Sequence, residues 1–83
     1  MFINKANDGR NNICGKKICI MRKNMKLSQK KLADLLQING LDLDKNAVQR
    51  IEAGKRFVTD IELTVISSVL NIAVNELLAP MHI

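Results

Sequence analysis

The chain has 83 residues, 47% of them apolar and 25% charged, which is the size and composition of one small globular domain. Its net charge of +5 comes from the N-terminal part, since residues 1–31 carry nine Lys or Arg and one acid. Residues 32–83 carry four Lys or Arg and seven acids. This suggests one face directed toward an anion, or simply an uneven solvated surface. The scarcity of aromatic residues, two Phe only, argues against a stacking platform for single-stranded nucleic acid.

No strand is predicted, and the chain is expected to form an arm followed by five short helices. Residues 1–12, rich in Asn, Asp and Gly and without an apolar period, predict a flexible N-terminal arm, and residues 13–83 predict one helical domain. The first helix is expected over residues 13–25. Its buried face consists of the apolar residues that recur at helical spacing, namely Cys14, Ile18, Met21 and Met25.

Capping residues mark the bounds of the next three helices. Ser28 is expected to open the second helix and Asp44 the third. The stretch from Thr59 to Glu62 has the form of a capping box that opens the fourth. The residues expected to end these three helices are Gly40, Gly54 and Asn71.

The C-terminal part is apolar and acidic. The fourth helix is expected to bury Ile61 and the apolar residues that follow it, and a short fifth helix is expected over residues 74–78. Two roles are open for the apolar residues at this end, since they either form a dimer surface or close the core. These residues are Leu77, Leu78, Met81 and Ile83.

Three stretches, LSQKKLADLL, NAVQRIEAGKR and TDIELTVISSVLNIAVNELL, occur in this order at compatible spacing. Together they resemble the lambda-repressor-like (Cro/cI or XRE-type) helix-turn-helix family over residues 13–78. The matching features are Ser28-Gln29 at the start of the second helix, Leu32-Ala33 within it, Ile51-Glu52-Ala53-Gly54 at the end of the third, and Lys55-Arg56 after it. The resemblance implies a compact all-α, five-helix DNA-binding domain whose helix-turn-helix is formed by the second and third helices. Leu36 and Val48 stand farther apart than is usual in the family, so a lengthened turn is expected.

The third helix is expected to read base pairs in the major groove. Val48 and Ile51 are expected to face the core, which leaves a polar set on the other side. The candidate base-reading residues are Lys45, Asn46, Gln49 and Arg50. Arg pairs bidentately with guanine, and Asn or Gln pairs with adenine. By resemblance Gln49 is the weakest of the four, and a solvated polar helix face is the alternative.

Phosphate contacts are expected on either side of this helix, from Ser28, Gln29, Lys30, Lys55 and Arg56. The first three lie at the start of the second helix, where backbone amides and the helix dipole favour an anion. In the family the Gln at this point commonly touches the DNA backbone. Such contacts position a protein without reading sequence, and for each Lys a solvated charge is the alternative. Lys5 and Arg10 in the arm either enter a minor groove or have no dedicated role.

Glu52 is the one acid in the basic stretch KNAVQRIEAGKR. It stands one position after Ile51 and four after Val48, so it is expected to face inward or sideways, toward the first helix. Arg22 lies at the edge of the buried face of that helix, and the family frequently pairs an Arg with a Glu at these two positions. The resemblance therefore implies a partly buried Arg22–Glu52 ion pair that fixes how the third helix leans on the first. An exposed, unpaired Glu52 is the alternative.

These expectations define a sequence-specific double-stranded DNA-binding transcriptional regulator, with repression expected, that acts as a cytoplasmic homodimer. The alternative is an antitoxin or co-regulator whose main role is to bind a protein partner. An enzyme is not expected, because the sequence has no Gly-rich phosphate loop and its one histidine, His82, is near the tail. Cys14 and Cys19 are spaced for neither a helical disulfide nor a metal pair, so no metal and no cofactor is expected. No membrane partner and no small-molecule ligand is expected either.

Overall fold

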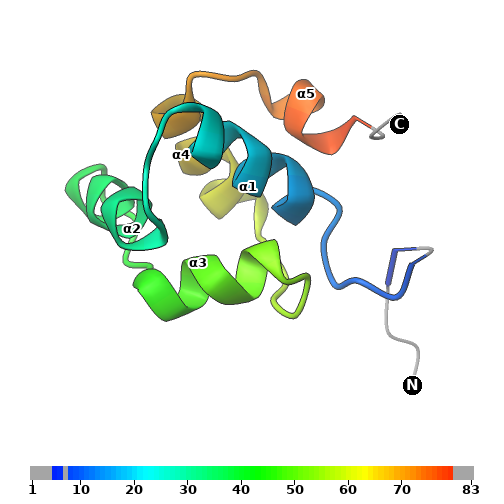
Figure 1. The fold of residues 1–83 in the computed structure, drawn as a ribbon. Coiled ribbons are helices and arrows are strands. Elements are labelled where there is room, and N and C mark those ends of the chain that lie inside the picture. The colour runs from blue at the N-terminus through cyan, green and yellow to red at the C-terminus, as the bar shows by residue number, and fades with distance from the viewer. Residues whose placement is uncertain (1–4, 7, 80–83) are drawn as a thin grey trace.

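The structure, a computed structural model, describes residues 5–6 and 8–79. Within this part of the chain it contains five helices and no strand (Figure 1). They are α1 (Gly15–Asn24), α2 (Gln29–Ile38), α3 (Lys45–Glu52), α4 (Asp60–Leu70) and α5 (Val74–Leu78). The expected all-α, five-helix architecture is therefore confirmed. None of the helices in the described residues is long and apolar enough to cross a membrane.

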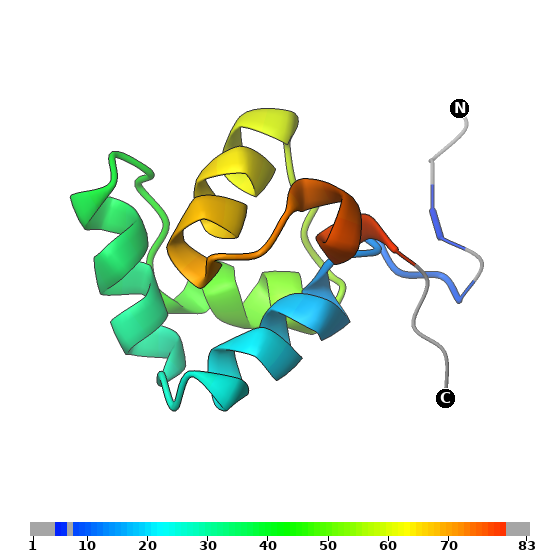
Figure 2. The same ribbon diagram turned by 90° about the horizontal axis from the view of Figure 1, so that it is seen from above.

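The helices pack around one core. α3 lies along one side of the molecule against α1 and α2, α4 contacts both α1 and α2, and α5 packs on α4. Figure 2, a view from above, shows α2 at one end of the molecule and α5 toward the other. Every helix contributes to the core, whose buried members are Cys14, Ile18, Leu32, Ala33, Leu36, Leu43, Val48, Ile51, Ile66, Leu70 and Leu77.

The predicted helix caps are present. The side chains of Ser28, Asp44 and Thr59 each accept a hydrogen bond from the backbone amide three residues on, at 3.0, 2.8 and 3.2 Å. Glu62 completes the capping box by accepting from the Thr59 amide at 3.0 Å. Asn71 ends α4 in the left-handed conformation, with φ of 55°. These local contacts set where α2, α3 and α4 begin.

Two residues that were predicted to be buried are exposed. Met25 is 41% exposed because α1 ends at Asn24, so Met25 follows the helix and does not lie on its buried face. Ile61 is 72% exposed because it stands about half a turn around α4 from the buried Leu70. Both predictions of burial are wrong, and both residues lie at a helix end.

The structure shows a core role for one of the C-terminal apolar residues. Leu77 is fully buried and closes the core, whereas Leu78 is 39% exposed. Met81 and Ile83, also predicted for a dimer surface, lie outside the described residues.

The connection between α2 and α3, residues 39–44, is lengthened, as expected. Gly40 turns the chain with a φ of +88°, a conformation that side chains rarely adopt. Leu43 then returns to the core, where it is 5% exposed, and its carbonyl accepts a hydrogen bond from Gln37 Nε2 at 3.1 Å. The longer connection is therefore packed against the domain and holds the start of α3.

Candidate nucleic-acid interface

The outer face of α3 carries the four predicted base-reading residues, Lys45, Asn46, Gln49 and Arg50. All four are exposed, and among the described residues none of their side chains is engaged in a hydrogen bond or ion pair. On the inner face, Val48 and Ile51 are only 2% and 1% exposed. The helix thus presents one face for packing and one face of free hydrogen-bonding groups, whose chemistry matches that of base edges.

At the start of α2, two of the predicted phosphate contacts have local partners. The Ser28 hydroxyl caps the helix through the Lys31 amide. Lys30 pairs with Asp34 at 3.2 Å, but the two side chains are 72% and 45% exposed. An exposed pair at this spacing is worth about 0.3–0.5 kcal/mol, so it leaves Lys30 available to an anion.

Arg22 and Glu52 form the ion pair implied by the resemblance, with side chains only 10% and 6% exposed. The guanidinium donates in a fork, from Nε to Glu52 Oε2 at 2.7 Å and from Nη2 to Oε1 at 3.1 Å. Its Nη1 donates to the Leu27 carbonyl at 2.7 Å. Gln29 Nε2 donates to the same carboxylate at 3.0 Å. One carboxylate therefore joins α1, the first turn of α2 and the end of α3.

Glu52 is charged in this setting. Burial opposes its ionisation, but hydrogen bonds from Arg22 and Gln29, together with the charge of Arg22, outweigh burial and lower the pKa of its carboxyl. The negative charge is held by partners inside the domain. This explains why an acid stands in a basic stretch, because Glu52 joins helices and leaves the outer face of α3 to the polar and basic side chains.

The two basic residues after α3 are placed differently. Lys55 is exposed, whereas Arg56 donates from Nη1 and Nη2 to the two carboxylate oxygens of Glu62, each at 2.9 Å. Hydrogen bonds from Arg56 hold the pKa of Glu62 below its ordinary value against the effect of burial. Arg56, predicted as a phosphate contact, is thus tied to the start of α4, and Lys55 is the freer cation of the two.

Residues 10–12, predicted as part of a flexible arm, lie against the end of α3, and we call them the N-terminal strap (Figure 1). They donate hydrogen bonds to five carbonyls in and after the last turn of that helix. The bonds run from Arg10 Nη2 to Glu52 at 2.7 Å, from Asn11 N to Gly54 at 2.8 Å, from Asn11 Nδ2 to Lys55 at 3.1 Å, and from Asn12 Nδ2 to Ile51 at 3.0 Å and Arg56 at 2.8 Å. The strap is therefore part of the folded domain, and a minor-groove role for Arg10 would require its bond to α3 to break.

Sequence reasoning missed the strap because its bonds are not local. One local signal was available, since Asn side chains often accept hydrogen bonds from backbone amides a few residues on. Asn12 Oδ1 does accept a hydrogen bond from the Gly15 amide at 2.8 Å. The bonds of Asn12 to Ile51 and Arg56, however, join residues 39 and 44 positions apart, which no local pattern indicates.

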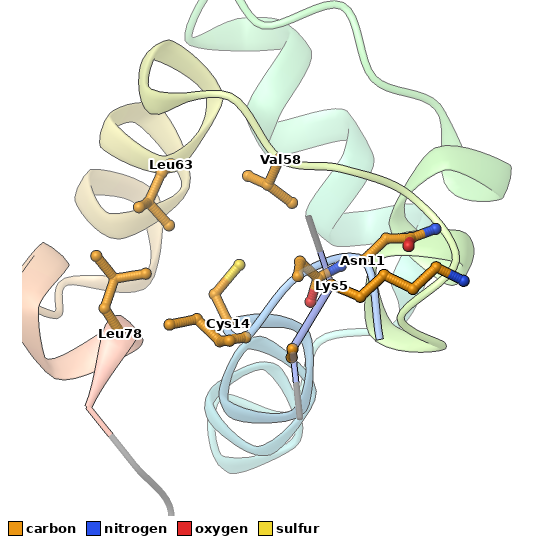
Figure 3. A pocket seen from close by; sticks show the side chains of 9 residues that line it. Lys5, Asn11, Cys14, Val58, Leu63 and Leu78 are labelled. Carbon is orange, nitrogen blue, oxygen red and sulfur yellow. The ribbon is translucent and has the colours of Figure 1, made fainter. Parts of the chain in front are cut away.

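A hollow of about 340 Å³ lies on the other side of the strap, toward α4 and α5 (Figure 3). Asn11 and Lys5 stand at one end of it, and its apolar lining includes Cys14, Val58, Leu63 and Leu78. Burial raises the pKa of the Cys14 thiol, which fits the role of a small apolar side chain. The lining includes no residue of α3, so the hollow is separate from the candidate interface.

Comparison with known proteins places these features in a family. A helix-turn-helix family model matches residues 20–77, which include all of α2 and α3. Among solved structures, the chain is similar to the restriction-modification controller protein C.AhdI from Aeromonas hydrophila, known from a high-resolution crystal structure. The two are 31% identical with a TM-score of 0.66, and the likeness covers 77% of this chain and 86% of that one. No curated protein matches the chain.

Proposed function

The chain belongs to the XRE-type helix-turn-helix family and is a DNA-binding transcriptional regulator, and from that premise we propose that it recognises one operator by inserting α3 into the major groove. In this proposal Lys45, Asn46 and Arg50 read base edges, with Gln49 as the weaker contributor. The target is double-stranded DNA in the cytoplasm, and the expected effect is repression.

The contrast between the two faces of α3 is the observation that carries this proposal. The four outer side chains are exposed and have no partner among the described residues, while Glu52 on the same helix is held by Arg22 and Gln29. A helix fixed on one side with free donors and acceptors on the other is what base reading requires. A helix face that only met solvent would have no need of so firm a scaffold.

Phosphate contacts in this proposal come from the start of α2 and from the residue after α3. The backbone amides at Ser28 and Gln29 lie at a helix N-terminus, where the dipole favours an anion. Lys30 and Lys55 add exposed positive charge. Arg56 is the weakest member of the predicted set, because a phosphate would have to compete with Glu62.

We also propose that the protein acts as a homodimer, because helix-turn-helix proteins commonly bind two half-sites about one helical turn apart. Leu78 is the exposed apolar residue of α5 that supports a contact there. C.AhdI is described as a restriction-modification controller protein. By likeness we propose that this chain controls transcription in a system of that kind. Sedimentation of wild type and Leu78→Glu tests the dimer, and an unchanged dimer in the variant would rule out this surface.

Selection from a pool of random duplexes at physiological salt tests the proposed function. Wild type is expected to enrich one site, in two symmetric halves, and Asn46→Ala/Arg50→Ala is expected to lose it. Each good bidentate contact contributes about 1–3 kcal/mol of discrimination, so the double variant should bind the selected site about 100-fold more weakly or worse. Direct titration of both proteins with the selected duplex measures this difference.

Lys23→Ala/Asn24→Ala is the matched control, because it also removes one cation and one amide from exposed helical positions, here on α1. It should keep the enriched site and lose at most some general, salt-sensitive affinity. If wild type enriches no site and all three proteins bind alike, base reading by α3 is refuted. A protein partner, as for an antitoxin or co-regulator, would then become the better explanation.

A further inference from the structure

The strap adds hydrogen bonds to the carbonyls at the end of α3. The last carbonyls of a helix have no partner within it. Here the carbonyl of Ile51 accepts from the Gly54 amide at 3.0 Å and also from Asn12, and that of Glu52 accepts from Arg10, whose positive charge also suits the negative end of the helix dipole. α3 has only eight residues, too few to be stable alone. Its end therefore depends on partners from other parts of the chain.

The same strap holds the loop that carries Lys55. Three consecutive carbonyls, those of Gly54, Lys55 and Arg56, accept hydrogen bonds from Asn11 and Asn12. The Lys55 amide in turn donates to the Arg50 carbonyl at 2.9 Å. The backbone of Lys55 is thus bound on both of its polar groups, although its side chain is exposed.

Two glycines allow this close approach. A side chain at Gly15 would collide with the carbonyl of Ile51, so the start of α1 and the end of α3 touch through their backbones. Gly54 has a φ of +78°, and a Cβ there would lie 2.6 Å from Cζ of Arg10. The guanidinium lies across the space that the missing side chain leaves.

Hydrogen bonds to α3 and the loop after it hold the strap in place. On its far side Asn11 and Asn12 border the hollow (Figure 3). Asn11 Oδ1 is buried without a hydrogen-bond partner among the described residues. Its amide nitrogen nevertheless reaches the Lys55 carbonyl. A side chain that binds the backbone of an exposed cation suggests a role in placing that cation.

We propose that the strap is a positioning element for DNA binding, in which Asn11 and Asn12 fix the loop after α3 so that Lys55 meets a phosphate. The proposal rests on the proposed function. It adds residues that lie before the family match, which begins at residue 20. Asn11 and Asn12 act through Lys55 and need not touch DNA themselves.

A double-mutant cycle between Asn11→Ala and Lys55→Ala in the full chain tests the proposal, read out as affinity for the selected operator and its salt dependence. One phosphate contact contributes about 0.9 to the slope of log K against log[salt], which is about fivefold in affinity at physiological salt. Each single variant should therefore bind about fivefold more weakly, with a slope smaller by about 0.9. The double variant should lose no more than Lys55→Ala alone.

Asn12→Ser is a second variant, because a hydroxyl can still accept from the Gly15 amide but cannot replace both amide donations to α3 and the loop. Like Asn11→Ala, it should bind the operator about fivefold more weakly and reduce the slope of log K against log[salt] by about 0.9. Asn24→Ala, which removes an exposed Asn from the end of α1, should bind as wild type does. Thermal unfolding by circular dichroism shows that each variant is folded at the assay temperature.

The proposal is overturned if Asn11→Ala and Asn12→Ser keep wild-type affinity and slope, or if their losses add to that of Lys55→Ala. It is also overturned if Lys55→Ala has no effect. In each of these cases the Asn46→Ala/Arg50→Ala comparison shows separately whether base reading by α3 still stands.

Discussion

Replacing one partner of the Arg22–Glu52 pair is expected to cost more stability than replacing both. Glu52→Met removes a carboxylate that accepts from Arg22 and Gln29, and leaves a guanidinium 10% exposed with the Leu27 carbonyl and the Cys19 sulfur as its acceptors. Stranding a buried charge in this way typically costs about 3–5 kcal/mol, and we expect about 3 because the bonds to Leu27 and Cys19 remain. Arg22→Met strands the carboxylate and should cost about the same. The double variant strands no charge and loses only the hydrogen bonds to Leu27 and Gln29, so about 2 kcal/mol is expected for it.

Urea unfolding followed by circular dichroism measures this cycle, since the chain has no Trp or Tyr for fluorescence. The expected coupling is about 4 kcal/mol, against a total stability of about 4–12 kcal/mol for a chain of this length. Lys30 and Asp34 are the matched control, because their pair is exposed and should show a coupling below about 1 kcal/mol.

Additive losses at Arg22 and Glu52 would refute the reasoning. They would mean that the two charges do not stabilise one another in the folded protein. The acid in the basic stretch would then need another explanation than the joining of helices.

Two further predictions concern the stability of the protein, first its dependence on pH and then its loss when Gly15 is replaced. The folded-state pKa values of Glu52 and Glu62 are lowered, so their stabilisation is present above the ordinary glutamate pKa of about 4.3 and is lost as pH falls through the folded values. Urea unfolding from pH 7 to pH 3 should therefore show the advantage of wild type over Glu52→Gln shrinking below about pH 4.3, and a gap that widens would contradict this. Gly15→Ala should cost about 3 kcal/mol, because its Cβ meets the Ile51 carbonyl. Gly40→Ala has open space around it and should cost only about 1 kcal/mol of left-handed strain, so equal thermal shifts in the two variants would argue against the close contact at Gly15.

Features set by neighbouring residues were predictable from the sequence. Ser28, Asp44 and Thr59 cap helices by accepting hydrogen bonds from amides three residues on. Both partners of each bond therefore lie within one short stretch of sequence, where the pattern can be recognised. The burial of Val48 and Ile51 follows from helical spacing in the middle of α3. The same spacing failed at helix ends, as at Met25 and Ile61, because periodicity does not say where a helix stops or which face its first turn shows.

Features that join distant residues were not predictable from local pattern. The strap is rich in Asn and lies beside a Gly, which is typical of a flexible segment, and its bonds to α3 cross about half the chain. Lys55 and Arg56 are adjacent and of like charge, yet only Arg56 is paired. The Arg22–Glu52 pair was anticipated because a family resemblance supplied the long-range contact. Composition alone would have left Glu52 unexplained.

The separation of roles within α3 has a consequence for how this protein can diverge. Val48, Ile51 and Glu52 hold the helix in place, while the four outer residues have no partner in the described part of the chain. Substitutions at the outer positions therefore carry little folding cost, typically within about 0.5 kcal/mol. A descendant of this protein can acquire a new operator by a few changes on one face of a single short helix. Such changes of target sequence need no compensating substitutions in the core.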